Sequence, residues 1–172
     1  MTEEGELRRT KIIEKEEDYF EFIRNIRKKL SDNSITDISS AYLSEPRGLY
    51  KNQSRYVIKP RSTKEVSECL KIATKYKIGI VPWSGGTGLV GGQIAPDKYS
   101  VTLSLERMNN IKNFSSINQS IEVEAGVILE TVHEFVNKRN FLFPLSMASK
   151  GTCCIGGNLA TNAGGIGVLK YG

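Results

Sequence analysis

Two glycine-rich segments hold the residue types that could do chemistry. The first is Pro82–Gly92, with the sequence PWSGGTGLVGG, and the second is Gly151–Gly165, with the sequence GTCCIGGNLATNAGG. Glycine lets a backbone approach a ligand without interference from a Cβ atom, and successive N–H groups can form a concavity for phosphate oxygens. The first segment alone is equally consistent with a glycine-rich hairpin. The second, interleaved with threonine and asparagine, shifts the balance towards an extended dinucleotide with a pyrophosphate at its centre.

The first segment also contains a formal match to the Rossmann fingerprint. Residues 86–91 read G-x-G-x-x-G, and Glu106 lies downstream at about the distance expected for a ribose-binding acid. That fingerprint requires its last glycine to open a helix. Here Gly92 and Pro96 oppose a helix, and the next periodic stretch is a strand, so we interpret the match as accidental. A P-loop is excluded as well, because no glycine precedes a Lys-Ser or Lys-Thr pair.

The elements that must position these segments are predicted from hydrophobic periodicity. Strands are expected over 56–60, 79–82, 101–105, 111–114 and 120–124. Helices are expected over 14–30, 62–76 and 128–138, with a short one over 155–163 whose N-terminus would point at a phosphate. Ser62-x-x-Glu65 is a capping box, and residues 31–54 read as irregular. The stretch 56–82 is then a β-α-β unit with parallel strands, and the alternation of Val101, Leu103 and Leu105 predicts a strand with one buried face.

Composition narrows the class of protein. The chain has 172 residues, of which 39% are hydrophobic, a net charge of +5, three cysteines and one histidine. Its basic residues are interspersed with acidic ones, which favours a solvated surface over a nucleic-acid site. No apolar run reaches the roughly eighteen residues of a transmembrane helix, and the acidic N-terminus lacks the pattern of a secretory signal. We therefore expect a cytoplasmic protein with no structural metal, a peripheral position at the inner membrane face being the alternative.

Several stretches resemble a known family. They are VPWSGGTGLVGG, SLERMNNI, VEAGVILE, FPLSMASKGTCCIGGNLATNAGG and the closing KYG, and the similarity spans residues 40–172. Together they resemble the FAD-binding domain of the vanillyl-alcohol-oxidase-type flavoproteins. Within that group they are most similar to the D-2-hydroxyacid dehydrogenases, which include the glycolate oxidase large subunit, D-lactate dehydrogenase and D-2-hydroxyglutarate dehydrogenase.

The resemblance implies an α+β fold of two subdomains. A helical lead-in over residues 1–40 would precede an FAD-binding domain over 41–172 that is incomplete at its C-terminus. Its first part, a small βαβ subdomain, would cover 52–92, and its second, a larger mixed-sheet subdomain, would cover 93–172. Relatives continue beyond the equivalent of residues 170–172 into a substrate domain, so a separately encoded C-terminal half is an expected partner.

The resemblance also implies roles for individual residues. In the first segment the residues expected to bind FAD are Pro82, Trp83, Ser84, Gly85, Gly86, Thr87, Gly88, Gly91 and Gly92, and among them the loop 82–88 would hold the pyrophosphate. In the second segment those expected around the pyrophosphate, ribityl chain and flavin ring are Gly151, Thr152, Ile155, Gly156, Gly157, Asn158, Thr161, Asn162, Gly164 and Gly165. The Trp83 ring could instead be a core contact, and Cys153 and Cys154 read as buried filler rather than reactive thiols.

Departures from the family pattern refine these expectations. Ser84 stands where relatives often have glycine, and a positive φ there would strain the loop. No histidine lies in the first segment, so FAD should be noncovalently bound. His133, the one histidine, reads as structural, and no catalytic residue is assigned. The expected function is the FAD-binding part of an oxidoreductase that converts a D-2-hydroxy acid to the 2-oxo acid. A non-catalytic remnant or flavin-binding module is the alternative.

Overall fold

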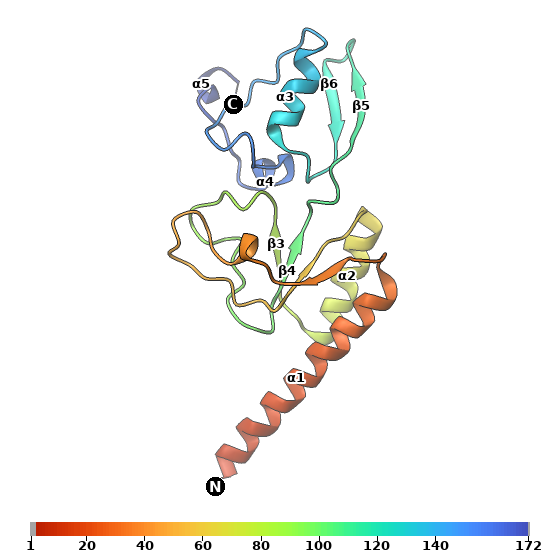
Figure 1. Cartoon of the computed structure of the whole chain (residues 1–172), viewed down its shortest axis with the longest axis vertical. Coiled ribbons are helices and arrows are strands. Elements are labelled where there is room, and N and C mark those ends of the chain that lie inside the picture. Colours follow the sequence, from red (N-terminus) through yellow and green to blue (C-terminus); the bar gives the residue numbers. More distant parts are fainter. Residues whose placement is uncertain (1–2, 172) are drawn as a thin grey trace.

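One four-stranded sheet forms the centre of the first half of the chain. In the computed structural model, which describes residues 3–171 and the side chains from residue 15 onward, the strand order is β1 (Ile35–Asp37), β2 (Tyr56–Ile58), β4 (Val101–Ser104), β3 (Ile80–Trp83). β1 pairs antiparallel with β2, while β4 pairs parallel with both β2 and β3. The helix α2 (Thr63–Tyr76) connects β2 to β3 (Figure 1). The predicted β-α-β unit is confirmed, with β4 inserted between its two strands.

The position of β4 corrects one sequence prediction. Its four residues are all buried, because a central strand is covered on both faces, whereas alternation predicted one buried face. Val101 and Leu103 belong to the core shared with the helices. On the other face of the strand, the Thr102 hydroxyl accepts from Asn52 Nδ2 over 3.0 Å. The backbone N–H of Thr102 donates to Ser54 Oγ over 3.1 Å. The alternating polar residues are thus buried with hydrogen-bond partners.

Two helices cover one face of this sheet. The helix α1 (Glu3–Lys29) is longer than the predicted 14–30 and extends away from the sheet towards the N-terminus (Figure 1). Its residues Phe22, Ile23 and Ile26 pack in one core with residues of α2 and the sheet. The N-cap of α2 is confirmed, since Ser62 Oγ accepts from the N–H of Glu65 over 3.2 Å. In a capping box the Glu65 carboxylate would accept from the N–H of Ser62. Here it accepts from the N–H groups of Arg61 and Ser31, which joins the start of α2 to the end of α1.

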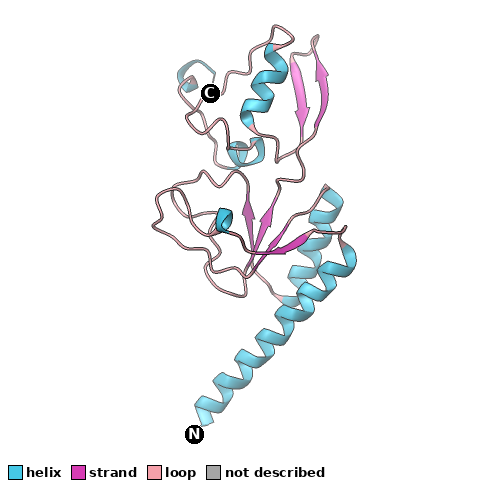
Figure 2. Cartoon of the chain, viewed as in Figure 1, coloured by secondary structure: helices cyan, strands magenta, loops and turns pink. Residues whose placement is uncertain are grey.

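Loops cover the opposite face of the sheet. The short 3-10 helix η1 (Ser40–Tyr42) brings Tyr42 against Val57 and Trp83 in a second small core. The prediction of irregular structure over residues 31–54 missed β1 and η1. α1 and β1 are part of the first sheet's core and edge. Figure 2 shows how much of this face is loop.

The second group of elements is smaller and packs around one helix. It consists of the antiparallel pair β5 (Ile111–Ser115) and β6 (Ser120–Val123), and the helices α3 (Leu129–Asn137), α4 (Ile155–Ala160) and α5 (Val168–Tyr171). Its core contains Val127, Leu129, Val132, Val136, Cys153 and Ile155. Among the described residues, the four-stranded sheet is mixed and the β5–β6 pair is antiparallel. β4, which follows residue 92, belongs to the four-stranded sheet.

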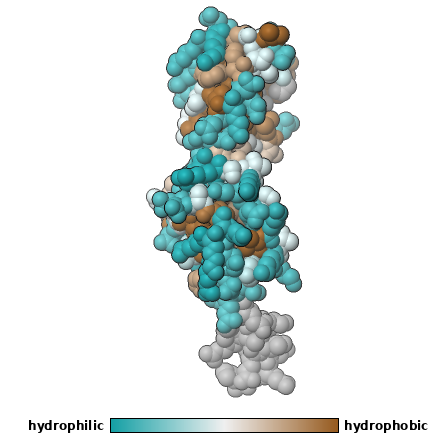
Figure 3. Space-filling view, turned by 90° about the vertical axis from the view of Figure 1, so that its right-hand side faces the viewer, coloured by the Kyte–Doolittle hydropathy of each residue, from teal (hydrophilic) through white to brown (hydrophobic). Residues whose placement is uncertain are grey.

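The surface carries apolar residues on both groups (Figure 3). Leu159, Ile166 and Leu169 of the second group are among the exposed large hydrophobic residues. None of the described helices is long and apolar enough to cross a membrane. Gly172, which ends the KYG stretch, lies outside the described residues.

Candidate cofactor site

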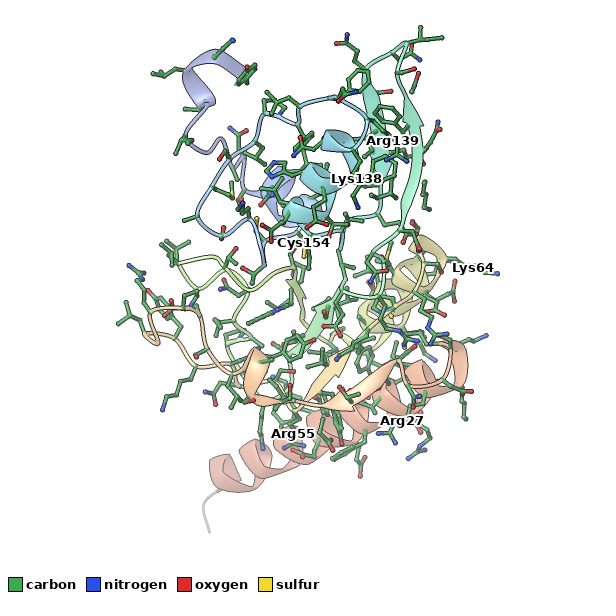
Figure 4. All side chains as sticks on the ribbon, turned by 45° about the horizontal axis from the view of Figure 1, so that its top comes forward. Arg27, Arg55, Lys64, Lys138, Arg139 and Cys154 are labelled. Atoms are coloured by element: carbon green, nitrogen blue, oxygen red, sulfur yellow. The ribbon has the colours of Figure 1, made fainter. Side chains whose placement is uncertain are left out.

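The two glycine-rich segments meet where the two groups of elements join. A Cβ atom on Gly85 would lie 2.1 Å from the carbonyl oxygen of Thr152, and one on Gly157 would lie 2.8 Å from Ser84 Oγ. Cys154 lies at this junction, between α4 and the end of β3 (Figure 4). The convergence expected from the sequence is therefore present, and it is a direct packing of one segment on the other.

The backbone of the first segment keeps its donors free. Within the described residues, no backbone N–H of residues 84–92 donates a hydrogen bond to another protein group. Consecutive N–H groups without a partner cost folding free energy unless water or a ligand accepts their hydrogen bonds. A run of such donors can hold the oxygens of a phosphate or pyrophosphate. The donor set of this loop therefore fits a nucleotide anion.

The N-terminus of α4 does not supply the donors that the sequence suggested. The N–H of Ile155 donates to Val127 O over 2.9 Å, and that of Gly156 donates to Ala125 O over 2.8 Å. Both donors are therefore used inside the protein. The N–H of Gly157 has no partner among the described residues, and this glycine faces Ser84. The prediction that α4 points its N-terminus at a phosphate is wrong for Ile155 and Gly156.

Glycines of the first segment serve different purposes. Gly86 has φ +68°, and a Cβ atom there would lie 2.4 Å from Cζ2 of Trp83. Gly91 has φ +79°, and its Cβ would lie 3.0 Å from the Tyr50 ring. A Cβ on Gly92 would meet nothing within 4 Å. Backbone conformation and packing therefore require Gly86 and Gly91, while Gly92 borders open space.

Glycines of the second segment also pack on protein. A Cβ on Gly156 would lie 2.7 Å from Cβ of Ala125, and one on Gly165, where φ is +63°, would lie 2.2 Å from Ser146 O. Asn162 adopts a left-handed conformation with φ +51°, which asparagine tolerates better than most residues. Thr161 donates its hydroxyl hydrogen back to Gly157 O over 2.9 Å.

Two predictions on the residues before the first glycine are resolved by burial and backbone geometry. Trp83 is 6% exposed and makes an edge-to-face contact with Tyr42 at a centroid distance of 5.1 Å. Of the two roles considered for the Trp83 ring, core packing and stacking on a cofactor, the structure shows core packing. Ser84 is not among the residues with positive φ, so the expected strain at this position is absent. Its Oγ is buried without a hydrogen-bond partner in the described structure.

A pocket of about 240 Å³ lies beside the second segment. Four expected site residues line it: Ile155, Asn158, Asn162 and Gly164. Its other walls come from residues 143–145, Leu159, Ala163 and Tyr171. No residue of the loop Pro82–Gly92 lines this pocket. The structure thus brings Thr152, Cys153 and Gly157 against the first segment, while Ile155, Asn158, Asn162 and Gly164 line a separate concavity.

The cysteines of the second segment are buried. Cys153 is 2% exposed, with its Sγ 3.6 Å from the Met147 sulfur, and Cys154 is 6% exposed. Burial raises the pKa of the Cys154 thiol, so the reactive thiolate is disfavoured. The interpretation of this pair as filler is supported.

Glu106 is held inside the first group. Its carboxylate accepts from the Tyr42 hydroxyl and from Ser104 Oγ, and it pairs with Lys59 Nζ over 2.9 Å. Burial opposes ionisation, but the hydrogen bonds from Tyr42 and Lys59 outweigh it and lower the pKa of Glu106 below its ordinary value. β4 follows the glycine loop where a Rossmann fold would have a helix, so the structure confirms that the fingerprint match is accidental.

His133 has a structural contact, as expected. It is partly buried on α3, and its Nε2 lies 2.8 Å from Leu145 O. With Nε2 protonated, the ring donates to that carbonyl and fixes the segment that leads to the second glycine-rich stretch. Lys150 pairs with Glu130 over 3.2 Å at the surface.

Sequence reasoning missed the residues that support the first segment. The Gln93 side chain, 9% exposed, donates from Nε2 to Gly88 O over 2.7 Å. Arg47 donates from Nη2 to Leu89 O, and Tyr50 packs on Gly91. The position of Gln93, a long polar side chain directly after the paired glycines, was the available signal. The contribution of residues 45–50 depends on contacts about forty residues away and had no local signal.

Residues 54–172, more than two thirds of the chain, match the family described as FAD binding domain. The chain belongs to this FAD-binding domain family. Its cofactor is FAD, and the unpaired N–H groups of residues 84–92 fit the anionic centre of that molecule.

Similar proteins agree with this assignment. A probable mitochondrial D-2-hydroxyglutarate dehydrogenase of Oryza sativa subsp. indica is 41% identical over 125 residues, which is 73% of this chain and 22% of that protein. A putative mitochondrial D-lactate dehydrogenase of Schizosaccharomyces pombe is 41% identical over 123 residues, covering 72% of this chain and 23% of that one. The FAD-binding chain thus spans about a fifth of the length of these relatives.

Solved structures share the fold. Alkyldihydroxyacetonephosphate synthase superposes with a TM-score of 0.77 at 24% identity, covering 88% of this chain and 31% of the other. p-Cresol methylhydroxylase superposes with a TM-score of 0.68 at 20% identity, covering 83% and 29%. The expected vanillyl-alcohol-oxidase-type fold is confirmed.

Proposed function

We propose that residues 84–92 bind the pyrophosphate of FAD through their backbone N–H groups. The observation that carries this proposal is the run of N–H groups without protein partners in a chain of the FAD-binding domain family. Backbone donors recognise phosphate oxygens without adding a charged side chain to the site. The hydroxyl of Thr87, which makes no hydrogen bond to another described residue, adds a side-chain donor to the loop.

The second segment completes the proposed site from the other side. Thr152 and Gly157 lie against the first loop through the contacts of Gly85 and Ser84. Asn158, Asn162 and Gly164 line the adjacent pocket, which we assign to the ribityl and flavin end of the cofactor. Binding is proposed to be noncovalent, because the first segment contains no histidine and His133 is engaged with Leu145.

The whole protein is proposed to oxidise a D-2-hydroxy acid to the 2-oxo acid. This proposal is supported by relatives named D-2-hydroxyglutarate and D-lactate dehydrogenase. Bound FAD would accept the two electrons of the substrate as a hydride equivalent. The residues of this chain would hold and orient the cofactor, and we assign none of the described residues to proton transfer. A flavin-binding module without turnover of its own is the alternative, and a cytoplasmic location stays a prediction.

Titration of the chain with FAD, followed by quenching of flavin fluorescence, tests the cofactor site. Gly92 is the position for a charge variant, since a side chain there meets nothing within 4 Å. We expect Gly92→Asp to weaken binding at least about tenfold by repulsion of the pyrophosphate, while the isosteric Gly92→Asn binds with nearly wild-type affinity. Gly86 is unsuitable for such a test, because any side chain there collides with Trp83.

The result has two clear outcomes. Saturable binding with the expected difference between the aspartate and asparagine variants would support the proposed pyrophosphate loop. Equal affinities of the two variants would place the pyrophosphate elsewhere, and a folded wild-type chain that binds no FAD would contradict the proposed function of this chain.

A further inference from the structure

Protein contacts determine which way the peptide groups of the glycine loop face. The carbonyl of Trp83 accepts from Leu105 N over 3.1 Å, and that of Gly91 accepts from Ile94 N over 3.0 Å. Between them, Gln93 Nε2 donates to Gly88 O over 2.7 Å and makes a longer contact of 3.4 Å with Gly86 O. The carbonyl of the next residue, Leu89, accepts from Arg47 Nη2.

Anchored carbonyls orient the following N–H groups. Each described peptide bond of the chain is trans, and in a planar trans peptide the C=O of one residue and the N–H of the next point in opposite directions. The N–H groups of Ser84, Thr87, Leu89, Val90 and Gly92 therefore point away from the residues that hold the preceding carbonyls. The loop presents donors because its acceptors are turned into the protein.

One of the anchors comes from a loop organised around a buried carboxylate. Glu45 is 2% exposed, and its carboxylate accepts from the N–H groups of Arg47 over 2.7 Å, Leu49 over 2.5 Å and Tyr50 over 3.3 Å. Asn52 N donates to Leu43 O over 2.8 Å and closes this loop, residues 43–52, which we call the brace loop. A carboxylate with several backbone donors is a strong organiser, because each bond is charge-assisted.

The brace loop contacts the glycine loop at two points. Besides the bond from Arg47 to Leu89 O, the Tyr50 ring lies against Gly91, within 3.0 Å of the place of a Cβ atom. Just beyond the brace loop, Gln53 N donates to Ala95 O over 3.1 Å, which ties the two segments together at their far end. The Glu45 carboxylate therefore acts on the glycine loop through the backbone that it orders.

We propose that Glu45, Arg47 and Gln93 are positioning residues that hold the N–H groups of residues 84–92 ready for the cofactor pyrophosphate. The inference rests on the proposed function of this loop as the FAD site. The three side chains act on carbonyls and on neighbouring backbone, not on the cofactor. Affinity is gained because the donors are ordered before binding, so that little conformational entropy is lost when the anion arrives.

The test combines backbone dynamics of the free chain with cofactor affinity. Gln93→Met keeps side-chain length and removes the amide, and Glu45→Gln keeps shape and removes the charge. In the wild type we expect 15N order parameters of about 0.85 for residues 84–92, falling below about 0.6 in both variants. The dissociation constant for FAD should rise roughly tenfold in each.

Glu65→Gln is the matched control. Its carboxylate also accepts backbone N–H groups, from Arg61 and Ser31, but at the junction of α1 and α2. It should leave both the order parameters of residues 84–92 and the FAD affinity unchanged. If Glu45→Gln does not fold, the test uses Gln93→Met and Arg47→Ala. The Arg47 side chain is 48% exposed, so its truncation should leave the chain folded.

The outcomes separate this inference from the proposed function. Unchanged order parameters in folded Gln93→Met and Glu45→Gln would overturn the positioning role, whether or not FAD binds. Disordered amides with unchanged FAD affinity would overturn it as well. Failure of the wild type to bind FAD would contradict the proposed function, while the order parameters would still show whether the brace loop orders the glycine loop.

Discussion

Gly85 and Thr152 are in such close contact that a Cβ atom on the glycine would lie 2.1 Å from the threonine carbonyl oxygen. The same Cβ would lie 2.7 Å from Cα of Cys153. The two glycine-rich segments therefore pack backbone against backbone, and this contact joins the sheet of the first group to α4 of the second. Gly85 must lack a side chain so that the two segments can pack together, and not only so that a ligand can approach the backbone.

Gly85→Ala should separate the two segments. We expect the free energy of unfolding to fall by about 3 kcal/mol, at the upper end of overpacking costs, because the colliding atoms are backbone. Denaturant unfolding of the variant measures this loss. Gly92→Ala is the matched control, since its Cβ meets nothing within 4 Å, and it should change stability by less than about 0.5 kcal/mol. Equal stability of the two variants would contradict the contact.

Ser84→Ala should not destabilise the chain without cofactor. The Ser84 hydroxyl is buried without a partner, and removal of an unsatisfied polar group is neutral or stabilising. We expect the free energy of unfolding to stay the same or to rise by up to about 1 kcal/mol. A thermal or denaturant unfolding curve of the cofactor-free protein provides the measurement. A clear loss of stability would mean that the hydroxyl has a partner.

Glu16 should contribute to the loss of stability in acid. A hydrogen bond from the Tyr99 hydroxyl, then one from Arg55, lowers the pKa of Glu16 from 4.5 to about 2 in the folded chain. Because the folded-state pKa is the lower one, this contribution is present above pH 4.5 and is lost as the pH falls towards 2. The stability difference between wild type and Glu16→Gln should therefore shrink across that window. Parallel stability profiles would refute the assignment.

The three thiols should be slow to react while the chain is folded. Burial raises the pKa of Cys69 to about 12 and also raises the pKa of Cys154, and Cys153 is 2% exposed. Alkylation depends on the thiolate and on access. Mass spectrometry after iodoacetamide treatment at pH 8 should show little modification of the native chain and full modification in denaturant. Rapid labelling of the native chain at Cys153 or Cys154 would contradict their burial.

FAD bound to the chain should be released intact on denaturation. His133, the one histidine, is engaged with Leu145 O and lies outside the first glycine-rich segment. Acid precipitation of the loaded protein should leave all flavin in the supernatant and none on the pellet. Flavin that stays with the polypeptide would show a covalent link and identify its residue by peptide mapping.

The local sequence determined most of the individual elements. Ser62 with Glu65 predicted the start of α2, and periodicity placed β2, β3, β5, β6 and α3 within a few residues. Gly92 and Pro96 correctly excluded a Rossmann helix after the glycine loop. These predictions succeeded because caps, turns and periodicity act over a few neighbouring residues, so their signals are present in the sequence itself.

Only the tertiary structure determined where β4 lies and what surrounds the glycine loop. The insertion of β4 between β2 and β3 buries Thr102, although alternation predicted an exposed face. The N–H groups of Ile155 and Gly156 donate to the carbonyls of Val127 and Ala125, respectively, about thirty residues earlier, and so are not free for a ligand. Strand order and hydrogen-bond partners are set by contacts between distant residues, which compete with local preference and leave no local pattern.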